Sequence, residues 1–271
     1  MIKQAIIPLA GLGTRLLPLT SVLPKELLPI NGKPVIEYIL DECINSGITQ
    51  IILIISKKKR SIKKYFYNDL FIKKIIKKNK RNKRLRIEYL KIKKYKKMIK
   101  FVYQNSPKGT GDAILKCKKY IKSKHFLMLL PDDLIIKKNC SLNMIKIHKK
   151  YNASVIASKK VRPTDVSRWG IFNYKNFKKN NFEITDVVEK PNKSSAPSNY
   201  AIIGRYILPS KIFKVLKNQK PGQNGEIHIT DAIKILINKK NKFIGHVFAG
   251  KYLDCGTMSG YINSSLEISR L

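Results

Sequence analysis

The order of apolar and amphipathic segments near the start of the sequence strongly limits the folds that the chain can adopt. Residues 4–9 and 50–55 are apolar runs of the kind found in buried parallel strands. Between them, residues 34–46 have apolar side chains at helical spacing, with a proline at the start and a glycine just after the end. A strand, a helix and a second strand in this order predict a right-handed crossover within a parallel sheet.

The alternation continues along the rest of the chain, without an internal repeat or a Gly/Ser linker. Further strands are predicted at residues 100–104, 125–130, 153–158, 170–174, 184–189, 200–207 and 243–248. Helices are predicted at residues 111–120, 142–151, 210–217 and 230–238, with a terminal helix after Gly256. We therefore predict an α/β fold with a doubly wound, mostly parallel (mixed) sheet of Rossmann-like architecture. A single domain over residues 1–271 is expected, and its C-terminal half should form the second side of a cleft.

The chain is strongly basic, with 56 Lys and Arg against 17 Asp and Glu and a formal net charge of +39. Such a charge can indicate a polyanionic partner. However, lysine is spread along the whole chain together with abundant Ile and Asn, which is typical of a compositional bias. In the densest basic block, residues 57–100, the apolar positions resemble the apolar faces of ordinary helices or strands whose exteriors are rich in lysine. These positions are Ile72, Ile75, Ile76, Leu85, Ile87 and Leu90. A nucleic-acid partner is therefore not expected.

The sequence contains neither a secretion signal nor a metal-binding cysteine motif. Its four cysteines are far apart and form no C-x-x-C pair, as expected for reduced thiols in the cytosol. The apolar run at residues 5–12 is interrupted by proline and glycine, and no later run has the length of a membrane span. We expect a cytoplasmic protein with no membrane partner.

A glycine-rich turn follows the first predicted strand and carries two nearby cations. Gly11 and Gly13 allow a phosphate or a base to approach backbone N–H groups closely. Arg15 can bind phosphate oxygens in a bidentate manner, and Lys25 adds a compact charge. The segment is neither a dinucleotide fingerprint, because Leu16 stands at the third glycine position, nor a Walker A loop, because G-K-[ST] is absent. With both cations present, the segment indicates a nucleoside triphosphate site.

Acidic residues in two distant segments are candidate metal ligands. Asp132 and Asp133 end an apolar strand, where a carboxylate would stand at the edge of the cleft. Asp254 likewise follows apolar residues and precedes a glycine turn. Carboxylate oxygens are the hard ligands that Mg²⁺ bound to phosphates requires. Asp133 could equally be a capping residue in a tight loop.

Other polar residues at predicted strand ends suit a base and a sugar phosphate. Gln104 has a side-chain amide that can recognise the edge of a pyrimidine, and Gly109 lets the backbone approach that base. Glu189 and Lys190 supply an acceptor for sugar hydroxyls and a cation for a phosphate from adjacent positions. Gly170 is suited to close approach of a sugar ring, although a plain strand bulge is the alternative.

Taken together, the motifs resemble those of the bacterial UTP–glucose-1-phosphate uridylyltransferase family of sugar nucleotidyltransferases. The resemblance runs in order from residue 2 to about residue 261. The motifs that carry it are GLGTRLLP, PKELLP, PKGTGDA, LPDD, VVEKP, SNYAIIGRY, GEIHITDAI and YLDCGT.

The resemblance implies a role for each candidate residue. Arg15 and Lys25 would hold the UTP phosphates, in a nucleotide-binding segment that also includes Gly13 and Glu26. Uracil would lie against Gln104 and the backbone around Ala10, Gly11 and Gly109. Asp132 and Asp254 would bind Mg²⁺, the expected cofactor. Glu189 would contact the glucose hydroxyls, Lys190 the phosphate of glucose 1-phosphate, and Gly170 the sugar. The N-terminal half would thus bind the nucleotide and the C-terminal half the sugar phosphate.

The implied reaction is Mg²⁺-dependent transfer of a uridylyl group from UTP to glucose 1-phosphate, by a homo-oligomer. A related enzyme that uses dTTP or another sugar 1-phosphate remains an alternative, as does a basic nucleic-acid-binding protein on the same scaffold. The sequence departs from the usual family pattern at Ser21, Asp112 and Trp169, where Lys, His and Tyr are more common. These departures bear on affinity and on the subunit interface rather than on the reaction.

Overall fold

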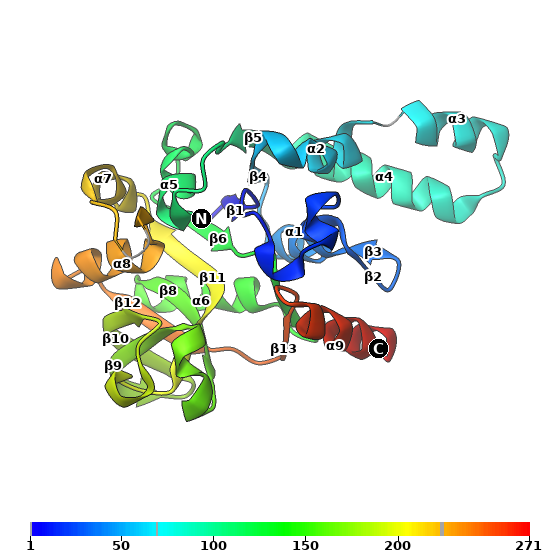
Figure 1. Cartoon of the computed structure of the whole chain (residues 1–271). Coiled ribbons are helices and arrows are strands. Elements are labelled where there is room, and N and C mark those ends of the chain that lie inside the picture. Colours follow the sequence, from blue (N-terminus) through cyan, green and yellow to red (C-terminus); the bar gives the residue numbers. More distant parts are fainter. Residues whose placement is uncertain (1, 69, 223–224) are drawn as a thin grey trace.

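A mixed β-sheet forms the centre of the computed structural model, which describes residues 2–68, 70–222 and 225–271. Within these residues the sheet has nine strands in the order β5-β4-β1-β6-β11-β8-β12-β10-β9 (Figure 1). The strands are β1 (Gln4–Pro8), β4 (Gln50–Ile55), β5 (Ile99–Tyr103), β6 (His125–Leu129), β8 (Ser154–Lys160), β9 (Gly170–Lys178), β10 (Asn181–Glu189), β11 (Tyr200–Pro209) and β12 (Phe243–Val247). The predicted α/β class is confirmed.

Parallel pairing is concentrated in the N-terminal half of the sheet. Strands β5, β4, β1 and β6 are all parallel, as the strand–helix–strand order predicts. Strand β11 is antiparallel to both β6 and β8, and β10 is antiparallel to β12 and β9. The sheet is therefore mixed. Strands β9 and β10 are also longer than predicted, because they pair with each other as a hairpin of two nine-residue strands.

Helices cover both faces of the sheet. The helices of the described residues are α1 (Val35–Asn45), α2 (Arg60–Tyr67), α3 (Leu70–Lys78), α4 (Lys83–Met98), α5 (Gly109–Leu115), α6 (Cys140–Tyr151), α7 (Ile212–Asn218), α8 (Ile229–Asn238) and α9 (Met258–Ser269). Neighbouring residues of β1 belong to two different hydrophobic clusters. Ile7 belongs to the cluster that includes residues of α1, α2 and α6, and Ile6 to the cluster that includes residues of α5, α7 and α8. This alternation follows from the two-residue period of a strand. The helix predicted at 111–120 is shorter, because α5 ends at Leu115 and a 3₁₀ turn follows at Lys118–Tyr120.

A buried ion pair fixes α1 against the sheet. Arg205 on β11 has no exposed surface, and its Nη2 atom lies 2.8 Å from Oε2 of Glu42 on α1. Glu42 also accepts a hydrogen bond from the backbone N–H of Ser141 at the start of α6. Since a buried charge needs a partner, this network couples three elements of the fold.

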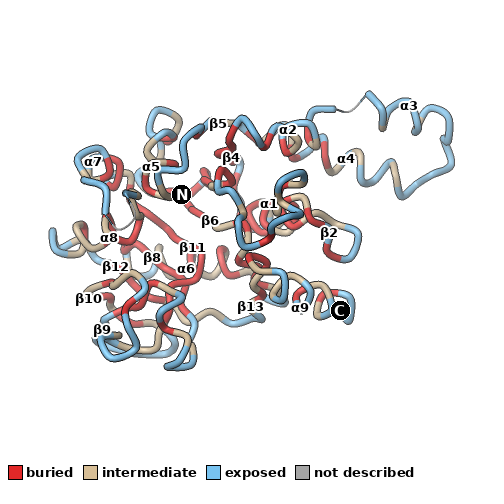
Figure 2. The backbone as a smooth tube through the Cα atoms, in the orientation of Figure 1, coloured by how far each residue is buried: buried red, intermediate tan, exposed pale blue. Residues whose placement is uncertain are grey.

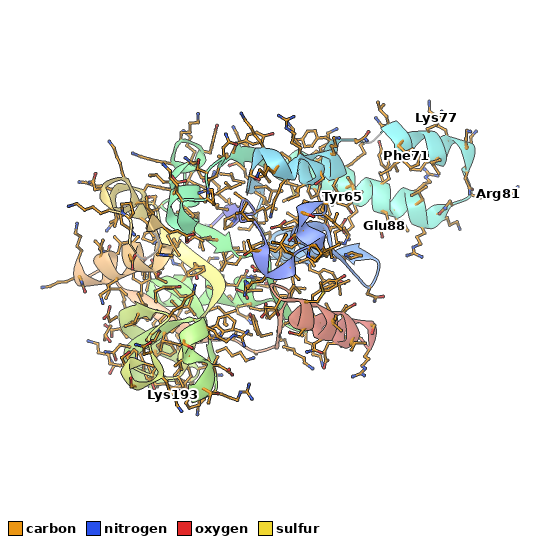
Figure 3. The ribbon with its side chains drawn as sticks, viewed as in Figure 1. Tyr65, Phe71, Lys77, Arg81, Glu88 and Lys193 are labelled. Atoms are coloured by element: carbon orange, nitrogen blue, oxygen red, sulfur yellow. The ribbon has the colours of Figure 1, made fainter. Side chains whose placement is uncertain are left out.

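The basic block forms a helical hairpin that projects from the body (Figure 1). The helices α3 and α4 are consistent with the prediction, but their apolar side chains are more exposed than predicted. None of the described residues of α3 is buried, and Ile87 and Leu90 on α4 are 64% and 60% exposed. Figure 2 shows the same exposure along the tube, and in Figure 3 the side chains of Lys77 and Arg81 extend from the outer end of the hairpin.

Two short strand pairs complete the described fold, and one of them shapes the site. Strand β2 (Pro29–Ile30) pairs with β3 (Lys33–Pro34) beside the glycine-rich segment. Strand β7 (Asp133–Ile136) pairs with β13 (Lys251–Asp254), with Asp133 opposite Asp254. This antiparallel pair brings together segments that are more than a hundred residues apart in the sequence. No described helix combines the length and the apolar character that a membrane crossing requires.

Candidate active site

Two adjoining cavities form a cleft at the carboxyl ends of β1, β6 and β10. Their volumes are about 410 Å³ and about 600 Å³. Arg15, Asp132, Glu189 and Lys190 line both of them. Cations from the N-terminal and C-terminal halves of the sequence therefore face one cleft.

The two candidate metal ligands converge on one point. The backbone N–H of Cys255 donates to the carbonyl oxygen of Asp132 at 2.7 Å, which holds the end of β13 against the end of β6. A Cβ atom added to Gly256 would lie 2.8 Å from Oδ2 of Asp132, 2.8 Å from Nη2 of Arg15 and 3.1 Å from Oδ1 of Asp254. Glycine at this position thus lets the two carboxylates and the guanidinium come close together. Neighbouring carboxylates are the hard ligands that Mg²⁺ takes, and its remaining ligands are commonly water and phosphate oxygens.

Both predicted phosphate-binding cations lie beside Asp132. Nζ of Lys25 is 2.6 Å from Oδ2 of Asp132, and Nη2 of Arg15 is 3.6 Å from the same oxygen. Burial alone would lower the pKa of Lys25, but attraction to Asp132 and then to Glu26 outweighs burial and raises it. Burial would likewise raise the pKa of Asp132, but the charge of Lys25 holds it below its usual value. Lys25 and Asp132 are thus both charged in the free protein.

Glu26 lies in the first cavity wall but is already bound by another side chain. It is 1% exposed, and Lys59 donates to its two carboxylate oxygens at 2.7 and 2.9 Å. Burial lowers the pKa of Lys59 despite the neighbouring Glu26 charge. Lys59 was not predicted from the sequence, because it lies within a run of basic residues whose other members face solvent.

The predicted base-recognition residues line the first cavity. They are Ala10, Gly11, Gln104 and Gly109. Nε2 of Gln104 donates to the carbonyl oxygen of Gly109 at 3.1 Å and to Oδ2 of Asp112 at 2.7 Å. Gly13 does not line either cavity; it has a φ of 74° and its carbonyl oxygen accepts a hydrogen bond from the Thr20 hydroxyl, so it shapes the turn.

The second cavity contains the predicted sugar-binding residues. Gly170 lies against Glu189, and a Cβ atom on Gly170 would lie 3.2 Å from Oε2 of that side chain. Lys190 is exposed and takes a positive φ of 44°. Arg168, which was not predicted, reaches Asp254 with Nη2 3.5 Å from Oδ2 and also lines this cavity.

Asp133 is buried, and hydrogen bonds occupy both of its oxygens. The Tyr252 hydroxyl donates to Oδ1 at 2.6 Å, and the backbone N–H of Gly204 donates to Oδ2 at 3.0 Å. Burial and then the adjacent Asp132 charge raise the pKa of Asp133 to about 6. These contacts favour a role in holding β7 against β11 and β13 over a direct role in ligand binding.

Tyr206 and Thr230 also line both cavities, and the sequence analysis did not single them out. Tyr206 lies within the buried strand β11, and Thr230 lies in the first turn of α8. A tyrosine in an apolar strand and a threonine at the start of a helix do not by themselves indicate a binding site. Each residue lines the cleft only because the tertiary fold places it there.

The arrangement places cationic side chains and carboxylates in one cleft at the carboxyl edge of a mixed α/β sheet, a lining that is suited to phosphorylated ligands. The family model described as "Nucleotidyl transferase" matches residues 4–270. The chain belongs to the nucleotidyl transferase family.

Related proteins have similar sequences over nearly their whole length. A protein of Mycoplasma genitalium named UTP–glucose-1-phosphate uridylyltransferase is 38% identical over 271 residues, covering 98% of this chain and 91% of the relative. A putative UTP–glucose-1-phosphate uridylyltransferase of Methanocaldococcus jannaschii is 36% identical, covering 99% and 93%. A crystal structure of UDP-glucose pyrophosphorylase in complex with UDP-glucose has a TM-score of 0.88 at 36% identity, covering 100% of this chain and 99% of the other. The UTP-bound enzyme from Acinetobacter baumannii has a TM-score of 0.88 at 32% identity, covering 99% and 93%.

Proposed function

We propose that this protein transfers the uridylyl group of UTP to glucose 1-phosphate, giving UDP-glucose and pyrophosphate. The observation that carries the proposal is the convergence of Arg15, Lys25 and Lys190 with Asp132 and Asp254 around one cleft. The names of the relatives at 36–38% identity support UTP and glucose 1-phosphate as the substrates. Because identity extends over nearly the whole chain, a scaffold kept only for nucleic-acid binding is the weaker interpretation.

In the proposed reaction, a phosphate oxygen of glucose 1-phosphate attacks the α-phosphorus of UTP in line. A bond forms between this oxygen and the α-phosphorus, while the bond from the α-phosphorus to the bridging oxygen breaks and pyrophosphate leaves. The attacking phosphate is already ionised at neutral pH, so no general base is required. Catalysis then depends on holding two anions together in the correct geometry.

The cations of the cleft reduce the repulsion between the two substrates. Arg15 and Lys25 lie on the nucleotide side and would bind the triphosphate, and Lys190 lies where the sugar phosphate would enter. Glu189, beside Gly170, would accept hydrogen bonds from sugar hydroxyls. Charge-assisted contacts of this kind stabilise the transition state most strongly in a site that excludes water.

The cofactor in this proposal is Mg²⁺, with Asp132 and Asp254 as its protein ligands. When bound, the ion would supply positive charge to the phosphates. Lys25 would also donate to the triphosphate, because its ammonium group carries three N–H donors and the contact with Asp132 uses one of them.

The helices on both faces of the sheet support a doubly wound single domain, with nucleotide binding in its N-terminal half and sugar-phosphate binding in its C-terminal half. A homo-oligomeric state and a cytoplasmic location stay predictions for this chain.

Pyrophosphate release tests the proposed function. The purified protein is mixed with UTP, dTTP or CTP and with glucose 1-phosphate or another hexose 1-phosphate, each with and without Mg²⁺. We expect the fastest release from UTP with glucose 1-phosphate in the presence of Mg²⁺. Faster release from dTTP or from another sugar would reassign the substrates, and tight RNA binding without any release would favour the nucleic-acid interpretation.

A further inference from the structure

The amide group of Gln104 is held in one orientation by two different acceptors. Its Nε2 atom lies 2.7 Å from Oδ2 of Asp112 and 3.1 Å from the carbonyl oxygen of Gly109. An ionised carboxylate and a carbonyl can only accept hydrogen bonds, so each must face the NH₂ group. The orientation thus follows from the chemistry of the neighbours, independently of how the amide atoms are assigned.

Both acceptors are themselves fixed in place. Gly109 has a φ of 90°, and a Cβ atom there would lie 2.6 Å from the carbonyl oxygen of Ile227. The same carbonyl accepts the backbone N–H of Gly111 at 2.7 Å, which secures the first turn of α5. Lys116, the residue directly after α5, has its Nζ atom 3.4 Å from Oδ1 of Asp112. One oxygen of the Asp112 carboxylate therefore lies near the Lys116 ammonium, and the other accepts a hydrogen bond from the Gln104 amide.

With both amide hydrogens engaged, Oε1 is the atom that Gln104 can offer to a base. Gln104 is only 5% exposed and lies in the wall of the first cavity, so water is poorly placed to mediate the contact. Uracil carries a hydrogen on N3 and can donate it to Oε1. Cytosine has a lone pair at N3 in place of this hydrogen. Its N3 and Oε1 of Gln104 would then be two acceptors in contact, which is costly in a buried site.

We propose that Asp112 is a positioning residue that selects uracil over cytosine by fixing the amide of Gln104. This inference rests on the proposed function, because it takes the first cavity as the base site. Asp112 acts through Gln104 and does not need to touch the nucleotide. Its effect should therefore appear in the choice between bases and not in the sugar-phosphate half of the reaction.

The test compares Asp112→Asn with wild type by measuring kcat/KM for UTP and for CTP. Where CTP is not turned over, its inhibition constant against UTP replaces kcat/KM. The asparagine keeps the shape of Asp112 but can donate as well as accept, so it no longer dictates the orientation of the amide. Asp186→Asn is the matched control, because Asp186 also pairs with a lysine, Lys234 at 2.9 Å, and lines neither cavity.

We expect Asp112→Asn to lower the preference for UTP over CTP about tenfold or more, since a misdirected hydrogen bond in a buried site is worth about that much. The control should keep the wild-type preference, and the KM for glucose 1-phosphate should be unchanged in both variants. An unchanged UTP-to-CTP ratio in Asp112→Asn, or an equal fall for both nucleotides, would overturn the inference while leaving the proposed function intact. A wild-type protein that releases no pyrophosphate from UTP would instead overturn the proposed function, and the inference with it.

Discussion

Replacing Lys25 by methionine should destabilise the free protein far more than the loss of an ordinary surface lysine. The Lys25 and Asp132 side chains are 14% and 18% exposed, and the distance between Nζ and Oδ2 is 2.6 Å. Removing one partner of a fully buried ion pair costs about 3–5 kcal/mol, whereas an exposed pair is worth about 0–1 kcal/mol. Because this pair is mostly buried and Arg15 still lies 3.6 Å from Asp132, we expect the free energy of unfolding to fall by about 2–3 kcal/mol.

Urea denaturation followed by circular dichroism measures this loss. Lys33→Met provides the matched control, because Lys33 pairs with Asp41 in a more exposed setting, with side chains that are 24% and 32% exposed. The control should lose less than about 1 kcal/mol. The reasoning would be refuted by equal losses in the two variants, or by a Lys25→Met protein as stable as wild type.

Added Mg²⁺ provides a second measurement on the same variants. In Lys25→Met the Asp132 carboxylate has lost its closest cation, so a divalent ion that binds the folded state should recover part of the lost stability. Lys33→Met should show no such recovery beyond that of wild type. An Mg²⁺ effect of the same size in all three proteins would argue against Asp132 as a metal ligand.

Three further substitutions test other parts of the structure. Lys190→Ala should raise the KM for glucose 1-phosphate about tenfold or more, because it removes a cation from the sugar-phosphate cavity. The control Lys193→Ala, at an exposed position, should leave this KM unchanged. Equal KM values in the two variants would exclude Lys190 from the site. Arg205→Met should lower the free energy of unfolding by about 3–5 kcal/mol in urea, because Glu42 stays buried without its partner, and a loss under about 1 kcal/mol would contradict this. His125→Asn should make the free energy of unfolding less dependent on pH in acid. Burial and then nearby positive side chains lower the pKa of His125 from 6.5 to about 4 in the folded protein. As the pH falls through this range, the unfolded chain therefore binds the proton before the folded protein does. Wild type should therefore lose more stability than the variant between about pH 7 and about pH 5, and equal losses would rule out His125 as the cause.

The sequence predicted the elements whose own residues determine their structure. Strand β4 matches its prediction residue for residue, because an apolar run such as QIILII has few alternatives to a buried strand. The placement of Arg15, Gln104 and Asp132 on one edge also followed from strand order, since parallel strands end on the same side of a sheet.

Features that depend on long-range pairing were not predictable in this way. The antiparallel direction of β11 and the length of the β9–β10 hairpin depend on which strands become neighbours. The burial of Lys59 against Glu26 could not be distinguished within a lysine run. The closeness of Asp132 and Asp254 around Gly256 depends on the pairing of β7 with β13. In the α3–α4 hairpin the helical pattern was visible, but a periodic apolar face does not establish that another element covers it.

The most direct test of the account is the rate of pyrophosphate release from UTP and glucose 1-phosphate, measured for wild type and for Asp132→Ala in the presence of Mg²⁺. We predict rapid release by wild type and a loss of Mg²⁺-dependent turnover in Asp132→Ala, because one of the two carboxylates beside Gly256 is then missing. Wild-type turnover by a correctly folded Asp132→Ala protein would contradict the assignment of this cleft as the active site.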